Sequence, residues 1–367
     1  TEKQGGSDVR ANSTIAVPLN GGGPGAEYEL TGHKWFCSAP MSDAFLTLAQ
    51  SDRGLSCFLV PRFRPDGTRN PFFIQRLKDK LGNRSNASSE IEYSDTWARM
   101  VGDEGRGVAT IIEMVHHTRI GAAVAPAGMM RHAVVQAVHH CSQRRAFGKP
   151  LIDQPLMRAV LADLVVEVEA ATLLVMRIAR AFDEGSRGDA AARAFARLAT
   201  AAAKYWTNKR APGLVVEALE CLGGAGYIEE SPLPRLYREA PLNGIWEGSG
   251  NVICLDVLRT LAREPDALGL VLAEIQPAAA ERRELAAMLS RLEALLRGTD
   301  HETRAREIVQ CLALALQAAL LVRHGHPAIA DAFCRTRLGD APPAVYGTLP
   351  VDVPTAEIVA RARPFPG

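Results

Sequence analysis

The chain has 367 residues, 47% hydrophobic and 23% charged, a composition typical of a globular protein with room for two or three domains. Its formal net charge of +1 gives no overall attraction to nucleic acid or to an anionic membrane. The seven cysteines are scattered and include no CxxC pair, which argues against a disulfide framework and a thiolate zinc site. We therefore expect a cytoplasmic protein without a metal site.

The first residues read as the middle of a domain. Thr1 is not Met, and no basic segment followed by an apolar segment comes after it. We therefore expect the chain to be a fragment of a longer protein.

Residues 1–105 have the pattern of a small β domain. Short alternating or apolar runs at 26–30, 45–49 and 57–60 are typical of strands. Turn-forming clusters rich in Gly, Pro, Asp and Asn separate these runs. Short strands punctuated in this way predict an antiparallel barrel or sandwich.

Residues 106–262 change to helical periodicity and predict a four-helix bundle. The glycines at 223, 224 and 226 end the third helix. The predicted helices are 108–143, 155–182, 190–222 and 249–262.

Residues 263–367 predict a further helical domain. Leu285, Met288, Leu289 and Leu292 follow the i, i+3, i+4 spacing of an amphipathic helix. The apolar run 308–322 contains Gln310 and is too short to cross a bilayer, so it predicts a buried helix. The stretch from Gly339 onward carries six prolines and is expected to be irregular. The predicted fold class is therefore α+β, with a β domain, a bundle and an extra helical region.

Five separated motifs together resemble the acyl-CoA dehydrogenase family. In order they are TEKQGGSDV at 1–9, GHKWFCS at 32–38, QRRAFGK at 143–149, LGGAGY at 222–227 and IWEGSGN at 245–251. The first and last motifs, with the extra helical domain, resemble the AidB-type branch, whose flavoproteins are linked to the bacterial response to DNA alkylation. In the family, an N-terminal helical domain precedes the β domain and the bundle, and that domain has no counterpart in this sequence.

The resemblance implies an FAD-dependent oxidoreductase that dehydrogenates acyl-CoA, passes electrons to an electron-transfer protein and forms a homotetramer. Dehydrogenation at Cα–Cβ needs a base for the α proton and a hydride acceptor, which only a cofactor supplies. Glu247 stands at the position of the base in many family members, and its backbone N–H is placed to polarise the thioester oxygen. The alternative is that Glu247 merely caps the helix that follows. Some members place the base on the helix that opens the bundle, but the matching residue here is Thr118, which cannot serve.

The resemblance also implies contacts with substrate and flavin. Ser7, Gly248 and Arg119 correspond to substrate-binding positions, although Arg119 is equally well explained as the partner of a bundle carboxylate. Trp35 offers a flat face to the flavin ring, and Cys37 or Ser38 lies near N5, where Cys37 replaces a usual threonine. Arg144 corresponds to an arginine that reaches the pyrophosphate of a neighbouring subunit's FAD. The remaining cofactor positions are Thr1, Ser7, Phe147, Gln154, Glu220, Gly223, Gly224, Ser249 and Asn251.

Two other functions compete with the enzyme. The first is a flavoprotein with weak or no turnover that binds and protects double-stranded DNA, as the AidB-type resemblance suggests. Residues 262–367 hold 12 Arg, no Lys and 13 Asp plus Glu, so DNA binding requires the arginines to gather on one face. The alternative is a set of solvated helix faces with paired charges. The second competing function is a catalytically silent scaffold. The candidate arginines are Arg282, Arg283, Arg304, Arg306, Arg335 and Arg337.

Overall fold

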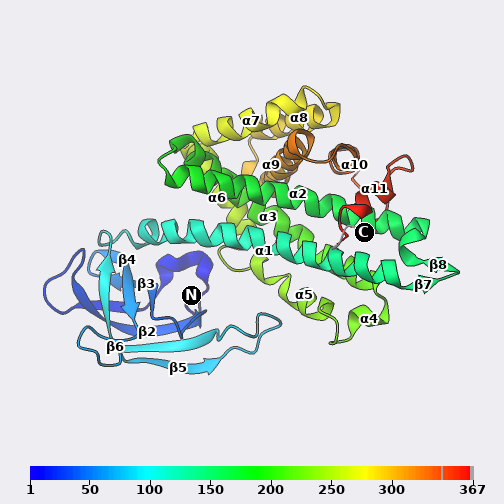
Figure 1. Cartoon of the computed structure of the whole chain (residues 1–367). Helices are drawn as coiled ribbons and strands as arrows, with labels where there is room; N and C mark the ends of the chain where they lie inside the picture. Colours follow the sequence, from blue (N-terminus) through cyan, green and yellow to red (C-terminus); the bar gives the residue numbers. More distant parts are fainter. Residues whose placement is uncertain (340–341, 364–367) are drawn as a thin grey trace. The chain divides into compact units, whose positions relative to one another are not determined.

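The computed structural model describes residues 1–339 and 342–363. Contacts between residues divide the chain into two compact units, Thr1–His117 and the part from Thr118 onward (Figure 1). We call them the barrel unit and the bundle unit and describe each by itself.

The barrel unit contains a closed sheet. The sheet order is β2-β1-β3-β4-β6-β5, and a further pairing of β2 with β6 closes it into a barrel with β5 outside the ring. All neighbours pair antiparallel except β1 and β3, which meet in parallel at Ile15 and Gln50. The barrel prediction is therefore confirmed. The strands of this fully described unit are β1 Ile15–Pro18, β2 Glu27–Cys37, β3 Ala44–Ser51, β4 Gly54–Pro61, β5 Phe72–Leu77 and β6 Ser89–Val101.

Side-chain alternation fills the barrel interior. Tyr28 and Leu30 on β2 are buried, as are Phe58, Ile91 and Met100 on neighbouring strands. Because successive strand residues point to opposite faces, the residues between them face outward. The alternation at 26–30 that predicted a strand therefore reflects the real interior and exterior of the barrel.

A buried ion pair anchors the N-terminal segment to β2. Glu2 pairs with Lys34 at 2.8 Å, and both side chains are almost fully buried. The Glu2 carboxylate also accepts hydrogen bonds from Ser13 and Thr14. Burial opposes ionisation of Glu2, but Lys34, Ser13 and Thr14 outweigh it and lower its pKa to about 2.

The bundle unit begins within a long helix. The predicted helices are confirmed as α1 Gly107–Gln143, α2 Pro155–Ser186, α3 Ala190–Cys221 and α6 Gly250–Arg263. Asp189 caps α3 by accepting a hydrogen bond from the Ala192 N–H. The short elements between these helices are β7 Arg145–Ala146, β8 Lys149–Pro150, η2 Leu151–Asp153, α4 Gly224–Tyr227, α5 Leu233–Glu239 and η3 Leu242–Gly244.

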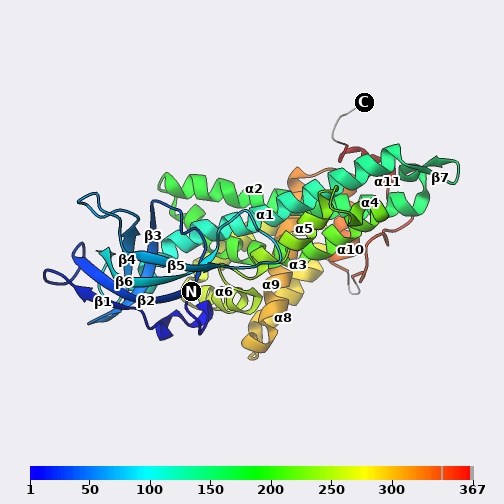
Figure 2. The same cartoon turned by 90° about the horizontal axis from the view of Figure 1, so that it is seen from below.

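The C-terminal helices share a core with the four-helix bundle. One buried apolar cluster has members from Ala123 to Ala362, so the bundle helices and the C-terminal helices contribute to a single core. Helix α9 packs against α2, α3 and α6 as well as against its C-terminal neighbours (Figure 2). By length and hydropathy α9 passes as a membrane span, yet 78% of that window is buried in the protein. The predicted division at residues 105 and 262 stays a prediction. These helices are α7 Pro265–Ala279, α8 Arg283–Arg297, α9 His301–His324, α10 Pro327–Arg337 and α11 Thr355–Ala360.

We expected the stretch after Gly339 to be irregular, but α11 forms a short helix in its described part. A buried polar network ties this stretch to the bundle. Arg337 bonds to Asp163 and Glu167, Arg210 bonds to Glu167 and to Tyr346, and the Gly347 N–H donates to Asp163. Each carboxylate in the network faces a guanidinium, which is the condition under which buried charges are tolerated.

The Glu2–Lys34 pair predicts a pH-dependent stability. Replacing Glu2 by Gln leaves a buried ammonium without its counter-charge, so we expect Glu2→Gln to lower the free energy of unfolding by about 3 kcal/mol at pH 7. A carboxyl whose pKa is lowered in the folded state stabilises above its unfolded pKa and loses that contribution as the pH falls toward about 2.

Urea unfolding of both proteins between about pH 7 and about pH 2 measures this contribution. The difference between parent and variant is expected to shrink below about pH 4.5. Glu29→Gln, on β2, is the matched control. A pH-independent difference contradicts the assignment.

Candidate active site

Glu247 lies in a strained turn between η3 and α6. Its φ is 57°, and Gly248 follows with a φ of 103°, so two consecutive residues occupy the left-handed region. A non-glycine residue there costs about 1 kcal/mol or more, because its Cβ approaches the backbone. A Cβ at position 248 lies 3.1 Å from Ile253 as well, so glycine suits that position. Such strain persists only where neighbouring contacts fix the backbone.

Two cationic side chains hold this turn by its carbonyl groups. Arg119 of α1 donates from Nε to the Glu247 oxygen at 3.1 Å. Lys204 of α3 donates from Nζ to the Gly248 oxygen at 2.6 Å. The two donors come from different helices, so the turn is attached to the bundle from two sides.

Asp256 of α6 holds Arg119 in place. The buried Asp256 carboxylate bonds to Arg119 at 2.7 Å, to Arg197 at 3.0 and 3.1 Å and to Arg259 at 3.1 Å. Burial opposes its ionisation, but Arg197 and Arg119 outweigh it and lower the pKa of Asp256. The guanidinium of Arg119 therefore donates hydrogen bonds both to the Asp256 carboxylate and to the Glu247 carbonyl oxygen. Its contact with substrate stays a prediction.

The carboxylate of Glu247 makes no hydrogen bond that stabilises the described part of the fold. It accepts no hydrogen bond from any residue in the described part of the chain, and the Glu247 N–H donates none there. The N-cap of α6 is Ser249, whose own side chain makes no capping bond. The alternative of Glu247 as a helix cap thus has no contact to support it.

The predicted flavin positions of the barrel unit lie around the N-terminal segment and β2. The Thr1 carbonyl accepts from the Trp35 and Phe36 N–H groups at 2.8 and 3.2 Å, which joins the first motif to the second. Ser7 and Ser38 are exposed, and their hydroxyls have no partner among the described residues. Burial raises the pKa of the Cys37 thiol, so it stays protonated at neutral pH.

Trp35 lies within a group of cations that the sequence did not reveal. The Lys78 ammonium lies 3.1 Å from the indole centroid, and Arg76 and Lys3 lie 5.6 and 5.9 Å from it. Three cations therefore gather around the indole ring of Trp35. The exposed hydroxyls, the aromatic face and the positive charge together fit a planar anionic cofactor such as a flavin nucleotide.

The predicted positions of the bundle unit fall into two groups. Arg144, Phe147, Gln154, Glu220, Gly223 and Gly224 lie at the end that carries β7 and α4, opposite to α6 (Figures 1 and 2). Phe147 is almost fully exposed, whereas the Gln154 amide is engaged with the Ala146 oxygen at 3.0 Å. Arg119, Glu247, Gly248, Ser249 and Asn251 form the second group, around the start of α6.

The distance between the two groups is large. Arg119 and Arg144 are separated by about 37 Å of helix at about 1.5 Å per residue. A residue at one end therefore cannot bind the same small group as a residue at the other end within one subunit. Asn251 in the second group accepts a hydrogen bond at 2.9 Å from Arg306 of α9, a partner that sequence reasoning missed.

The arginines proposed for DNA binding are engaged in other contacts. Arg282, Arg335 and Arg337 pair with acidic residues, and so do Arg283 and Arg304. Arg306 donates to Asn251. The arrangement is that of paired charges, and DNA binding stays a prediction of the resemblance.

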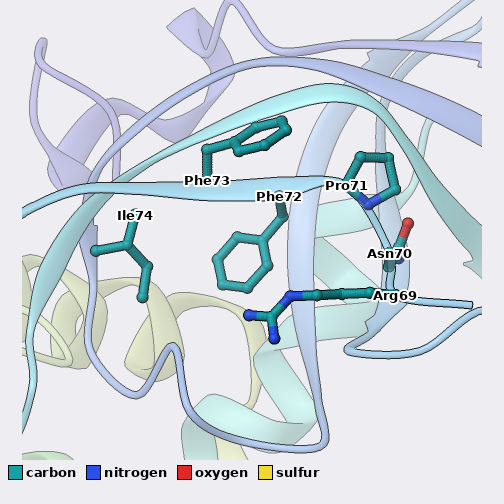
Figure 3. Close-up of a pocket in the computed structure, with 6 residues that line it drawn as sticks. All are labelled: Arg69, Asn70, Pro71, Phe72, Phe73 and Ile74. Atoms are coloured by element: carbon teal, nitrogen blue, oxygen red, sulfur yellow. The ribbon is translucent and has the colours of Figure 1, made fainter.

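A hollow of about 470 Å³ lies on the barrel unit, lined by residues 69–74. The side chains of Arg69 and Phe72 point to one side of this segment and Phe73 to the other (Figure 3). None of the predicted site residues lines it.

Comparison with known proteins gives consistent matches. Residues 1–96 match the acyl-CoA dehydrogenase middle domain, and residues 105–262 match the acyl-CoA dehydrogenase C-terminal domain. AidB of Escherichia coli strain K12 is 48% identical over 338 residues, which are 92% of this chain and 61% of that protein. The chain spans about three fifths of the length of the curated relatives it matches.

Solved structures agree. Caenorhabditis elegans ACDH-11 in complex with C11-CoA has a TM-score of 0.85 and 32% identity, covering 93% of this chain and 64% of that one. An acyl-CoA dehydrogenase from Bacillus anthracis complexed with FAD has a TM-score of 0.77, covering 92% and 66%. Its identity is 19%, so this second likeness concerns the fold alone.

The attachment of the turn by Arg119 is testable. A lysine ammonium is a point charge and lacks the planar set of donors of a guanidinium. The Arg119→Lys variant therefore cannot donate to the Asp256 carboxylate and to the Glu247 carbonyl oxygen at the same time. We expect hydrogen–deuterium exchange of peptides covering 242–253 to accelerate about tenfold, which equals about 1.4 kcal/mol. Arg259→Lys, which removes a half-exposed contact with the same carboxylate, is the control and is expected to change exchange little. Equal exchange in both variants contradicts the role of Arg119.

Proposed function

This chain belongs to the acyl-CoA dehydrogenase family and to its AidB-type branch, and from that premise we propose that it is an FAD-dependent acyl-CoA dehydrogenase. The observation that carries the proposal is the Glu247 turn. The carboxylate and the backbone N–H of Glu247 have no hydrogen-bond partner in the described part of the chain. The backbone of the same turn is held by side chains from two helices, Arg119 of α1 and Lys204 of α3. The turn is strained and firmly attached, yet the Glu247 carboxylate makes no contact that stabilises the fold. This combination favours a catalytic role for Glu247.

Glu247 removes a proton from Cα of the acyl thioester. The C–H bond breaks, its electron pair stays on the substrate as an enolate, and the proton goes to the Glu247 carboxylate. The unpartnered N–H of Glu247 is available to donate to the thioester oxygen, where the enolate charge develops. Bound FAD supplies the acceptor for the β hydride, which no side chain can provide.

The residues that we propose as FAD contacts fit the cofactor by their chemistry in each unit by itself. On the barrel unit, Ser7 and Ser38 offer free hydroxyls, and Trp35 offers one aromatic face among cations. On the bundle unit, Ser249 has a hydroxyl that caps nothing. The proposed FAD contacts are thus polar donors and one stacking face, as a flavin nucleotide requires.

Arg144 supports an oligomer. It is exposed, has no side-chain partner among the described residues and lies about 37 Å along α1 from Arg119. We propose that it binds the pyrophosphate of FAD in a neighbouring subunit, because a guanidinium fork matches phosphate oxygens. Phe147 beside it is 96% exposed, which also favours burial against another subunit. A homotetramer meets both requirements.

The substrate proposed is an acyl-CoA, and the electron acceptor proposed is an electron-transfer protein. ACDH-11, a structural relative that covers 93% of this chain, was solved in complex with C11-CoA, so a medium or long acyl chain is the first substrate to test. The cytoplasm is the proposed location.

Replacement of Glu247 tests the base. We expect flavin-loaded Glu247→Gln to keep its FAD but to bleach at least about 100-fold more slowly than the parent with a panel of acyl-CoA substrates, since a positioned base contributes about that factor or more. Stopped-flow absorbance of the flavin measures the rate. Glu230→Gln, an exposed residue of the bundle unit, is the control. Bleaching of Glu247→Gln at the parental rate rules out Glu247 as the base.

A further inference from the structure

Two cations and no acid stand at the start of α6. Arg306 of α9 donates from Nε to the Asn251 side-chain oxygen at 2.9 Å. A Cβ at Gly250, the first residue of the helix, would lie 3.3 Å from the ammonium nitrogen of Lys209 on α3. The first turn of α6 contains no acidic residue, and neither cation forms an ion pair with any of the described residues.

This arrangement is the opposite of the usual preference at a helix N-terminus. The backbone dipoles give that end a partial positive charge, so anions are favoured there and cations are not. The N–H groups of Gly250, Asn251 and Val252 have no partner in the described part of the chain, and the Ser249 side chain does not cap them. The start of α6 therefore combines free donors with uncompensated positive charge, which a bound anion would satisfy.

A buried phenol reaches the same place and is independent of the helix end. Tyr205, one turn before Lys209 on α3, is 7% exposed, and its hydroxyl has no hydrogen-bond partner among the described residues. Its ring would lie 3.4 Å from a Cβ at Gly250. Burial raises the pKa of Tyr205, so the hydroxyl keeps its proton and is able to donate. A buried polar group without a partner is costly, and a ligand at the start of α6 would remove that cost.

Arg306 differs from the other arginines that were candidates for DNA binding. The five others pair with acidic residues, whereas Arg306 reaches the start of another helix. Guanidinium and ammonium groups beside free backbone N–H groups are the donors that bind phosphate oxygens. Two cations and a helix end match the charge of a pyrophosphate better than that of a single carboxylate.

We propose that Lys209, Arg306, the Tyr205 hydroxyl and the first turn of α6 bind the pyrophosphate of a nucleotide cofactor. FAD and CoA both carry this group, and FAD is the expected source. The inference rests on the flavin part of the proposed function and does not need Glu247 as the base. Arg306 lies outside residues 105–262, which match the family's C-terminal domain, so the additional helices become part of the cofactor site. Arg144 of a neighbouring subunit would bind the same pyrophosphate from another side.

Titration of the whole chain, freed of flavin, with FAD tests the proposal. We expect Arg306→Gln and Lys209→Gln each to raise the Kd for FAD about tenfold, and the double variant about 100-fold, because each change removes a charged donor to phosphate. Quenching of flavin fluorescence measures the Kd. Arg304→Gln, on the same helix but paired with Glu307, is the matched control and is expected to stay within about twofold of the parent.

Salt separates phosphate binding from a purely structural role of Arg306 as the partner of Asn251. Ions screen exposed charges, so the Kd of the parent for FAD is expected to rise steeply between about 0.05 M and about 0.5 M NaCl, and that of the double variant much less. Arg306→Lys keeps the charge and is expected to recover most of the affinity. Weaker binding with an unchanged salt dependence means that the variants altered packing alone, and it overturns the proposal.

Titration with CoA identifies the source of the pyrophosphate. Parental affinity for FAD together with about tenfold weaker binding of CoA assigns the group to CoA. Unchanged affinity for both molecules overturns the inference and leaves the proposed function intact. A parent chain that binds no FAD overturns the flavin part of the proposed function itself. Lys209 and Arg306 are exposed, so we expect both variants to fold, and thermal unfolding checks this.

Discussion

The buried carboxylate of Asp256 is the interaction on which the geometry of the candidate site depends. It binds Arg119 of α1, Arg197 of α3 and Arg259 of its own helix, and Arg119 then reaches the Glu247 carbonyl. Three helices are joined to the turn in this way through a single acidic side chain. Without Asp256, three guanidinium groups would face one another, and the turn would lose one of its two attachments.

The buried charged side chains of the bundle unit fix the positions of neighbouring groups more than they stabilise the fold. Replacing buried ion pairs by apolar residues is often neutral or stabilising, so such pairs are weak candidates for the source of fold stability. Apolar packing already forms one continuous core from Ala123 to Ala362. The ionic groups lie where direction matters: Asp256 and Lys204 around the turn, and Arg337 where the C-terminal stretch meets α2.

Sequence reasoning predicted the helices and proposed Glu247 as the base, but it did not predict the groups that surround them. The bundle helices follow local periodicity, and each has a Gly or Pro near at least one end, so their bounds were predicted to within a few residues. Glu247 was found because its motif is continuous in sequence. Lys204 at the turn and Lys78 on Trp35 were missed, because each meets its partner across more than 40 positions and nothing local marks the pairing. Arg119 was found, but its partner Asp256 lies on another helix.

The left-handed backbone at Glu247 sets the stability of the fold against the proposed activity. Glycine adopts that conformation without strain, whereas glutamate pays for it in the folded state. A Gly at this position would therefore give a more heat-resistant protein without the acid that we propose as the base. A design that optimised thermal robustness alone would favour that exchange.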